Sequence, residues 1–398
     1  MSRLRPLLTR SLAAVDHAAD RARHGVKRRY GLWRGLRIAA YFGYAGEERL
    51  HLSGRVLDDQ ARHPSGDPSL WTNAWNTLQR IDSDEVPGAR VELELAGATA
   101  TAEADEEGFF HFELPTPPSL VPGRRWQGRL RLLDPAGDEG VTAEAAGLYP
   151  GANSRFAVIS DLDDTVVRTG ATSRLRMTRT VLFNDARTRV PMPGIGALYR
   201  ALAAGAGGDE GNPVFYLSSS PWNLYSLFAE LLRLHGVPEG PIFLRDFGFD
   251  RDKLWKAPHE EHKPALVRHL RDVYPRLALV LAGDSGQKDA EVYRALAEED
   301  PERVAAVLVR DVSPDARDRE VRAIARELER IGVPMALVGT SAEAAERAAD
   351  LGLIARDAVG EVGAAEEEDR RSRREPRGLK RWLLGISSAP GSPSPPPR

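Results

Sequence analysis

Three aspartates stand directly behind a run of apolar residues in the segment FAVISDLDDTVVRTG, residues 156–170. Asp161 and Asp163 are two positions apart where a buried strand is expected to end, so extended backbone sends both side chains to one side. Two carboxylates this close repel each other unless a proton or a cation lies between them. Because hard divalent cations prefer oxygen ligands, the pair predicts a Mg²⁺ site. An Asx-turn explains a single aspartate here, but not the array.

Other polar residues follow further short apolar runs. The segment LVLAGDSGQKDAEVY places Asp284 at the end of a second expected strand and Asp289 in the first turn of the next helix. The segment VFYLSSSPWN adds Ser218 and Ser219 from a third strand, and Lys263 opens a helix in EHKPALVRHL. Lys263 as a solvated helix residue and Asp289 as a charge favoured by the helix dipole are the plainer interpretations. The complete set is instead typical of phosphoryl transfer, which requires a nucleophile, an acid/base, a metal and donors for phosphate oxygens.

The motifs carry a specific resemblance. The segment DLDDT matches the D-x-D-x-T signature of the haloacid dehalogenase superfamily, and Ser218, Lys263 and GDSGQKD follow in the order and spacing of its other motifs. The segments DLDDTV, YLSSSPWNLY, GPIFLRDFG, HKPALVRHL, GDSGQKDAEVY and VLVRDV resemble the actin-patch-associated phosphatidate phosphatases and their bacterial relatives. The resemblance covers about residues 150–355 and implies Mg²⁺-dependent removal of phosphate from phosphatidate, which yields diacylglycerol.

The resemblance also implies a role for each residue. Asp161 would be the nucleophile that carries an aspartyl-phosphate, and Asp163 would protonate the leaving alkoxide and then deprotonate water. Asp161, the backbone carbonyl of Asp163 and Asp284 would bind Mg²⁺. Asp289 would support the metal shell or Lys263, and Lys263 would neutralise charge on the phosphoryl oxygens and the nucleophile.

One serine of the SSS run is expected to hydrogen-bond the phosphoryl group. Ser218 is favoured because it is the first polar residue after VFYL, and Ser219 is the alternative. Thr165, the last residue of DLDDT, is a secondary candidate for the site, with no role assigned to it.

The substrate is less closely defined by the sequence. Between the strand of Asp161 and that of Ser218, a helix GIGALYRALAAG leaves room for only a short flap, RTGATSRLRMTRTVLFNDARTRVP, and no large cap. An uncapped site admits a lipid headgroup in a membrane or a protein side chain. The arginines and apolar residues of the flap either contact acidic lipid or belong to a solvated hairpin. The alternatives to a lipid phosphatase are a phosphatase for a soluble phosphomonoester or phosphoprotein and a noncatalytic binding module. A binding module has no reason to keep all the charged residues of the site.

The composition predicts a folded chain with two domains or one embellished domain, since 398 residues exceed one ordinary core. With 42% hydrophobic and 28% charged residues and a net charge of −3, no nucleic-acid partner is expected. The absence of cysteine excludes disulfides and cysteine nucleophiles. Because no apolar run approaches the roughly 20 residues of a membrane span and the N-terminus lacks a secretory signal core, we expect a cytoplasmic protein.

The elements that must position the site are predicted from residue 150 onward. Short apolar runs alternate there with segments of helical periodicity, which indicates a parallel sheet with helices on both faces. The runs RFAVISD, PVFYLSS, PIFLRD, LALVLAGD and VAAVLVRD each end in a polar or acidic residue. Ligands bind beyond the carboxyl ends of the strands in such folds. The resemblance implies that this catalytic domain, residues 150–357, is a haloacid-dehalogenase-like Rossmannoid domain.

Three other regions flank the predicted catalytic domain. Residues 46–149 alternate apolar and polar positions over strand lengths, and resemble the small transthyretin-like β-sandwiches appended to many enzymes. Residues 1–45 are predicted to form a basic amphipathic helical segment, which either packs on its own domain or docks peripherally on an anionic membrane. Residues 358–398, charged and then rich in proline and serine, are predicted to be a disordered tail.

Overall fold

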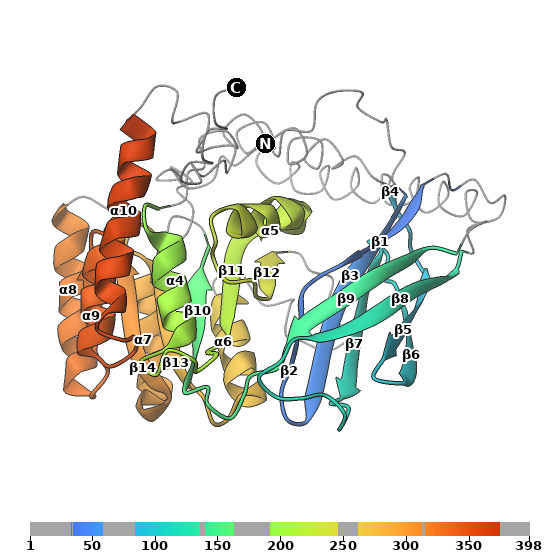
Figure 1. Ribbon diagram of the computed structural model, residues 1–398, viewed down its shortest axis with the longest axis horizontal. Coiled ribbons are helices and arrows are strands. Elements are labelled where there is room, and N and C mark those ends of the chain that lie inside the picture. Colours follow the sequence, from blue (N-terminus) through green and yellow to red (C-terminus); the bar gives the residue numbers. More distant parts are fainter. Residues whose placement is uncertain are drawn as a thin grey trace, which may run out of the picture. The chain divides into compact units, whose positions relative to one another are not determined.

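The structure is a computed structural model that describes residues 33, 35–58, 84–135, 140–162, 192–245, 262–312 and 315–374. The chain divides into two compact units (Figure 1). The described residues up to Tyr149 belong to the first unit and those from Pro150 to the second. Among the described residues, no helix is long and apolar enough to cross a lipid bilayer.

The first unit is a nine-stranded mixed β-sheet. Its strands are β1 (Leu36–Ala40), β2 (Gly43–Ala45), β3 (Arg49–Asp58), β4 (Asp84–Glu85), β5 (Arg90–Leu95), β6 (Ala98–Glu103), β7 (Phe109–Pro115), β8 (Trp126–Asp134) and β9 (Thr142–Leu148). The order is β1-β3-β2-β9-β8-β5-β6, and β4 and β7 also pair with β3. The β2–β9 pair is parallel and the other pairs are antiparallel. The predicted β region is therefore confirmed as a mixed sheet.

Strand alternation builds the core of this unit. Along β5, Val91, Leu93 and Leu95 are buried and enter one cluster with apolar side chains from β1, β2, β3, β7, β8 and β9. Because strands across the whole sheet share this cluster, the sheet curves around its own core. Trp126 fills the core where a Cβ at Gly43 or Gly147 would approach its ring to 2.6 or 2.3 Å. Glycine at these two positions therefore lets β2 and β9 pass the indole.

The second unit is a six-stranded parallel sheet with helices, as the predicted α/β class requires. Its strands are β10 (Phe156–Asp161), β11 (Val214–Pro221), β12 (Ile242–Arg245), β13 (Ala278–Asp284), β14 (Val304–Arg310) and β15 (Met335–Val338), in the order β12-β11-β10-β13-β14-β15. Its helices are α4 (Ile195–Ala204), α5 (Tyr225–Leu234), α6 (His262–Val273), α7 (Asp289–Glu299), α8 (Asp315–Arg330), α9 (Ser341–Asp350) and α10 (Ala358–Arg374), with short 3₁₀ turns η2 (Trp222–Leu224) and η3 (Pro301–Arg303).

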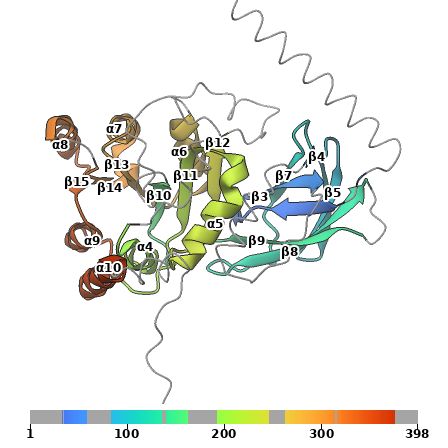
Figure 2. The same ribbon diagram turned by 90° about the horizontal axis from the view of Figure 1, so that it is seen from above.

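Burial on both faces explains why the strands of this sheet are continuous apolar runs. Every residue of β10 is buried, and all but the first residue of β13 are. Helices α4, α9 and α10 pack together on one face, and α6, α7 and α8 lie on the other (Figure 2). A parallel sheet needs this double cover, because its central strands have no solvent-facing side. The two aspartate-bearing strands β10 and β13 are therefore adjacent central strands.

Strands occupy part of the predicted N-terminal helical segment. Residues 36–40 and 43–45 are β1 and β2, so the helical prediction for residues 1–45 is wrong over these positions. Pairing with β3 decides their conformation, because β1 aligns Leu36 to Ala40 with Asp58 to Gly54 of that strand. Tertiary pairing of this kind outweighs the helix preference of leucine and alanine. Residues 1–32 and 34, where most of the basic residues of that segment lie, are outside the described residues.

A helix likewise occupies the start of the predicted disordered tail. Helix α10 spans Ala358–Arg374 within the predicted tail of residues 358–398. Its acidic side chains bind the beginnings of two other helices: the carboxylate of Glu366 accepts the Ala342 N–H of α9 at 2.8 Å, and that of Asp369 accepts the Gly194 N–H before α4 at 2.8 Å. Charged residues that resemble a solvated tail are therefore N-terminal caps for neighbouring helices. Residues 375–398 lie outside the described residues.

Candidate active site

Three buried aspartates meet at the carboxyl ends of the central strands. Asp161 is the last residue of β10, Asp284 is the last residue of β13, and Asp289 begins α7. Their side chains are at most 1–2% exposed, and each has an oxygen within 4.8 Å of an oxygen of the others. Parallel pairing of β10 with β13 places the first two side by side. We call Asp161, Asp284 and Asp289 the aspartate cluster.

Lys263, the second residue of α6, bridges two members of the cluster. Its Nζ lies 2.7 Å from Oδ1 of Asp161 and 2.6 Å from Oδ1 of Asp289. Burial lowers the pKa of Lys263, but the adjacent charges of Asp161 and Asp289, with their hydrogen bonds, outweigh burial and hold this pKa above its usual value. Lys263 is therefore an ammonium that holds these two carboxylates in position.

The loop that follows β13 orients Asp284 and Asp289. Oδ1 of Asp284 accepts the backbone N–H of Gly286 at 2.6 Å and that of Gln287 at 2.9 Å. Oδ2 of Asp289 accepts the N–H of Asp284 at 3.2 Å. A Cβ at Gly283 would stand 2.5 Å from Oδ2 of Asp289, so glycine is required for this approach. The segment GDSGQKD thus forms a turn that directs the carboxylates of Asp284 and Asp289 toward the aspartate cluster.

Burial, followed by the negative charge of Asp289, raises the pKa of Asp284 to about 7. Hydrogen bonds from Gln287 and Gly286 and the charge of Lys263 act in the opposite direction. The cluster combines three carboxylates with the ammonium of Lys263, so negative charge exceeds the positive charge of that lysine. A donor set of buried carboxylate oxygens fits a hard divalent cation, which would offset this excess. The aspartate cluster can therefore hold a metal ion.

The serine run lies beside the end of β10. The N–H of Leu162 donates to the carbonyl of Leu217 at 2.7 Å, which brings Ser218 next to that end. Ser218 is 2% exposed and its Oγ accepts the N–H of Ser220 at 2.9 Å, whereas Ser219 is exposed. The choice between Ser218 and Ser219 as phosphoryl ligand stays a prediction.

Two predicted site residues lie outside the described residues. These are Asp163, the predicted acid/base, and Thr165. The arginine-rich flap also lies there. The described part of the site thus brings together Asp161, Lys263 and the pair Asp284 and Asp289.

Arg317 is a supporting residue that sequence reasoning missed. From α8 its guanidinium donates to the carbonyls of Ser285 at 3.1 Å and Gln287 at 3.0 Å, and binds Glu291 through two contacts of 2.7 Å. It therefore clamps the loop that carries Asp284. An arginine on a highly charged helix carries no local signal of this role, because its partners are distant in sequence.

The match to a known family lies in the second unit. Residues 156–311 match the family described as "Phosphatidate phosphatase APP1, catalytic domain". "Phosphatidate phosphatase APP1" of Saccharomyces cerevisiae (strain ATCC 204508 / S288c) is 30% identical over 164 residues, which are 41% of this chain and 27% of that protein. "Uncharacterized protein C29B5.04c" of Schizosaccharomyces pombe (strain 972 / ATCC 24843) is 26% identical over 162 residues, which are 40% of this chain and 26% of that protein.

The matched segment covers less than half of this chain and an even smaller share of the two relatives. It spans about a quarter of the length of the two yeast relatives. A solved carbohydrate acetylesterase structure from Xanthomonas citri covers 74% of this chain, and the chain covers 75% of it, at a TM-score of 0.26 and 12% identity, a likeness too low to support an argument. The segment that matches the family contains all four charged residues of the described site. Residues 156–311 therefore match the phosphatidate phosphatase APP1 catalytic-domain family and show distant homology to the yeast protein, as the motifs predicted.

Proposed function

We propose that this chain is a Mg²⁺-dependent phosphatidate phosphatase with a haloacid-dehalogenase-like catalytic domain, which hydrolyses phosphatidate to diacylglycerol and phosphate. The observation that carries the proposal is the aspartate cluster with Lys263, buried at the carboxyl ends of adjacent parallel strands inside the matched segment. Burying charged groups costs several kcal/mol per ion before compensation. A noncatalytic binding module gains nothing from burying these charged groups, whereas phosphoryl transfer requires them.

Asp161 is the proposed nucleophile. Its contact with Lys263 at 2.7 Å favours the ionised carboxylate, which is the form that attacks. A carboxylate oxygen forms a bond to phosphorus while the bond from phosphorus to the glycerol oxygen breaks, which leaves an aspartyl-phosphate and an alkoxide. Water then attacks the same phosphorus, and the bond to Asp161 breaks to release phosphate and restore the carboxylate.

The proton transfers are assigned to Asp163. It gives a proton to the departing alkoxide and takes one from the attacking water, so it ends the cycle as it began. The family resemblance supports this role through the D-x-D-x-T signature.

Charge on the phosphoryl group is offset by the other residues. Lys263 donates to Asp161 and Asp289, so an ammonium already lies beside the attacking carboxylate. Asp161, the backbone carbonyl of Asp163 and Asp284 would hold Mg²⁺, and Asp289 keeps Lys263 in place. When bound, the metal ion supplies Lewis-acid stabilisation of the phosphoryl oxygens. Ser218 donates a hydrogen bond to one of those oxygens.

An assay of the purified chain tests the proposal. Phosphatidate vesicles and soluble phosphate esters, including a phosphopeptide, are supplied separately with Mg²⁺ or with a chelator. We expect Mg²⁺-dependent release of phosphate from phosphatidate at a higher kcat/KM than from the soluble compounds. A preference for a soluble ester would instead make the chain a phosphatase for that class, and a folded protein that hydrolyses none of them would overturn the enzymatic proposal.

Peripheral contact with an anionic membrane is proposed for the basic N-terminal segment. Ten Arg or Lys residues stand against two Asp in residues 1–37. Each basic residue near an anionic surface contributes about 1 kcal/mol. Because Trp33 packs against the core of the first unit, a truncation that spares the fold removes residues 1–32. We expect this variant to bind anionic vesicles more weakly at low salt while hydrolysis of a short-chain phosphatidate is unchanged; equal vesicle binding would assign the segment a structural role.

A further inference from the structure

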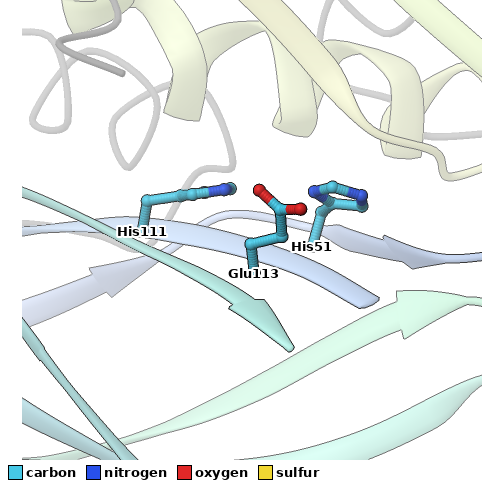
Figure 3. Close-up of side chains that lie close together, drawn as sticks. All are labelled: His51, His111 and Glu113. Carbon is cyan, nitrogen blue, oxygen red and sulfur yellow. The ribbon is translucent and has the colours of Figure 1, made fainter. Parts of the chain in front are cut away.

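Two histidines and a glutamate converge on one face of the first unit's sheet. His51 lies opposite Glu113 in the antiparallel pair of β3 and β7, and Ser53 lies opposite His111. Since His111 and Glu113 are two residues apart on one strand, their side chains share a face. Figure 3 shows the Glu113 carboxylate between the two imidazole rings. One ligand atom of each residue lies within 4.8 Å of those of the others.

We propose that His51, His111 and Glu113 form a binding site for a divalent transition metal ion, Zn²⁺ foremost. Two imidazole nitrogens and one carboxylate oxygen are a donor set that zinc favours, whereas magnesium favours oxygen alone. Three protein ligands leave the fourth position of a tetrahedral ion to water or to an added ligand. The site belongs to the first unit and does not depend on the phosphatase proposal.

The separation of the two rings is close to that of a shared metal ion. Tetrahedral zinc with bonds of about 2.0–2.1 Å places two ligand atoms about 3.4 Å apart and two imidazole centroids about 5 Å apart. The centroids of His51 and His111 are 6.0 Å apart with 28° between the planes. Side-chain rotation closes a gap of this size, because His111 and Glu113 are exposed and unconfined by a core. The strand pairing that sets the spacing need not change.

The surroundings of the two rings also fit ligation. The Oγ of Ser53 and Nδ1 of His111 are 3.0 Å apart. When Nδ1–H donates to this hydroxyl, Nε2 keeps the lone pair that a metal ion accepts. The ring of Tyr44 stacks on that of His51 at 4.7 Å with 17° between the planes, which orients the second imidazole. Partners of this kind commonly orient metal-binding histidines.

A surface ion pair is the competing role for Glu113. Arg49 lies 3.5 Å from the Glu113 carboxylate, and the two side chains are 56% and 51% exposed. Water screens exposed pairs, so this one contributes little to stability and a metal–carboxylate bond displaces Arg49 at small cost. The ion pair gives no reason for His51 and His111 to stand on either side of the carboxylate.

Zinc titration of the full-length, tag-free protein in excess Mg²⁺ tests the site, because Mg²⁺ competes for the oxygen ligands of the aspartate cluster. The matched variants are His111→Gln, Glu113→Gln and Ser53→Ala. Glu94→Gln is the control, since it removes an exposed glutamate from β5 of the same sheet. Isothermal titration measures affinity and stoichiometry, and Co²⁺ absorption spectra report nitrogen ligation.

We expect the wild type to bind one Zn²⁺ that the His111→Gln/Glu113→Gln double variant does not. Each single ligand variant should lose at least about tenfold in affinity, Ser53→Ala about tenfold, and Glu94→Gln nothing. Circular dichroism verifies that the variants are folded. The proposal is overturned if the wild type binds no Zn²⁺ under these conditions, or if the double variant binds it with the stoichiometry and affinity of the wild type.

Discussion

The aspartate cluster and the His51–His111–Glu113 site are two groups of potential metal ligands in opposite physical settings. All three aspartates are buried at the carboxyl edge of the parallel sheet, and the side chain of Lys263 among them is 14% exposed. In the other group His51 is buried, whereas His111 and Glu113 are exposed on the face of a sheet. Buried charges interact strongly and are fixed before a ligand arrives, whereas exposed groups are screened and free to rotate.

This difference predicts which properties of the protein a substitution in each group changes. Removing one member of the aspartate cluster leaves others charged and without water, so both stability and chemistry respond. Removing His111 or Glu113 changes an exposed position, so metal affinity responds while stability changes little. The following substitutions test this contrast.

The largest effect is expected from Asp161→Asn. An amide of nearly the same volume cannot attack phosphorus, so the proposed phosphatase activity should fall at least about a thousandfold while the fold is kept. Phosphate release from phosphatidate measures the loss, and Asp209→Asn on an exposed loop is the control that should keep full activity. Residual activity within tenfold of the wild type would contradict the nucleophile assignment.

Lys263→Met should destabilise the metal-free protein by about 3 kcal/mol, because it leaves Asp161 and Asp289 buried without their shared cation. Urea unfolding in the presence of a chelator measures the change. The matched control is Arg268→Met on the same helix, whose ion pair with Glu299 is 42% and 35% exposed and should cost less than about 1 kcal/mol.

Combining Lys263→Met with Asp161→Asn should recover part of the stability, since one of the stranded charges is then gone. If Lys263→Met and Arg268→Met lowered the free energy of unfolding equally, burial would not distinguish the two ion pairs.

Asp284→Asn should change the pH dependence of stability. Burial and Asp289 raise the Asp284 pKa from 3.8 to about 7, so the folded metal-free protein binds this proton more tightly than the unfolded chain does. This contribution to stability is complete below about pH 4 and is lost as the pH rises through about 7. Asparagine stays neutral throughout this pH range. The free energy of unfolding of the variant should therefore exceed that of the wild type by on the order of 1–2 kcal/mol at about pH 8, and by less at about pH 5.

Urea unfolding with a chelator at these two pH values measures the Asp284→Asn difference. The added stability that Mg²⁺ gives to the wild type at high pH should also decrease in the variant, because one metal ligand is gone. A difference from the wild type that is the same at both pH values would contradict the role of the Asp284 charge.

The smallest effect is expected from Arg49→Gln. Its pair with Glu113 is exposed, so the free energy of unfolding should change by less than about 0.5 kcal/mol. The variant should bind Zn²⁺ at least as tightly as the wild type, because the carboxylate loses a competitor. Urea unfolding and zinc titration provide the two measurements. A decrease in the free energy of unfolding above about 2 kcal/mol would remove the energetic contrast between the two sites.

The local sequence pattern was sufficient to predict much of the fold of the second unit. Apolar runs of strand length, helical periodicity between them and a polar or acidic residue at each strand end predicted the parallel sheet and the edge at which Asp161 and Asp284 lie. These features depend on side-chain alternation and helix period, which act over a few residues. Helical periodicity was misleading for β1, and charged composition was misleading for α10; the conformations of both depend on partners far along the chain.

The sequence alone determined the residue types, their order along the chain and the family motifs, because each is local. Only the tertiary structure decided which side chains meet: Lys263 reaches both Asp161 and Asp289, and Arg317 clamps the loop of Asp284 from another helix. No motif joins His51 to His111, and the register of β3 against β7 brings them to one face. Contacts between distant segments depend on how helices pack and how strands align, and local spacing carries no information about either.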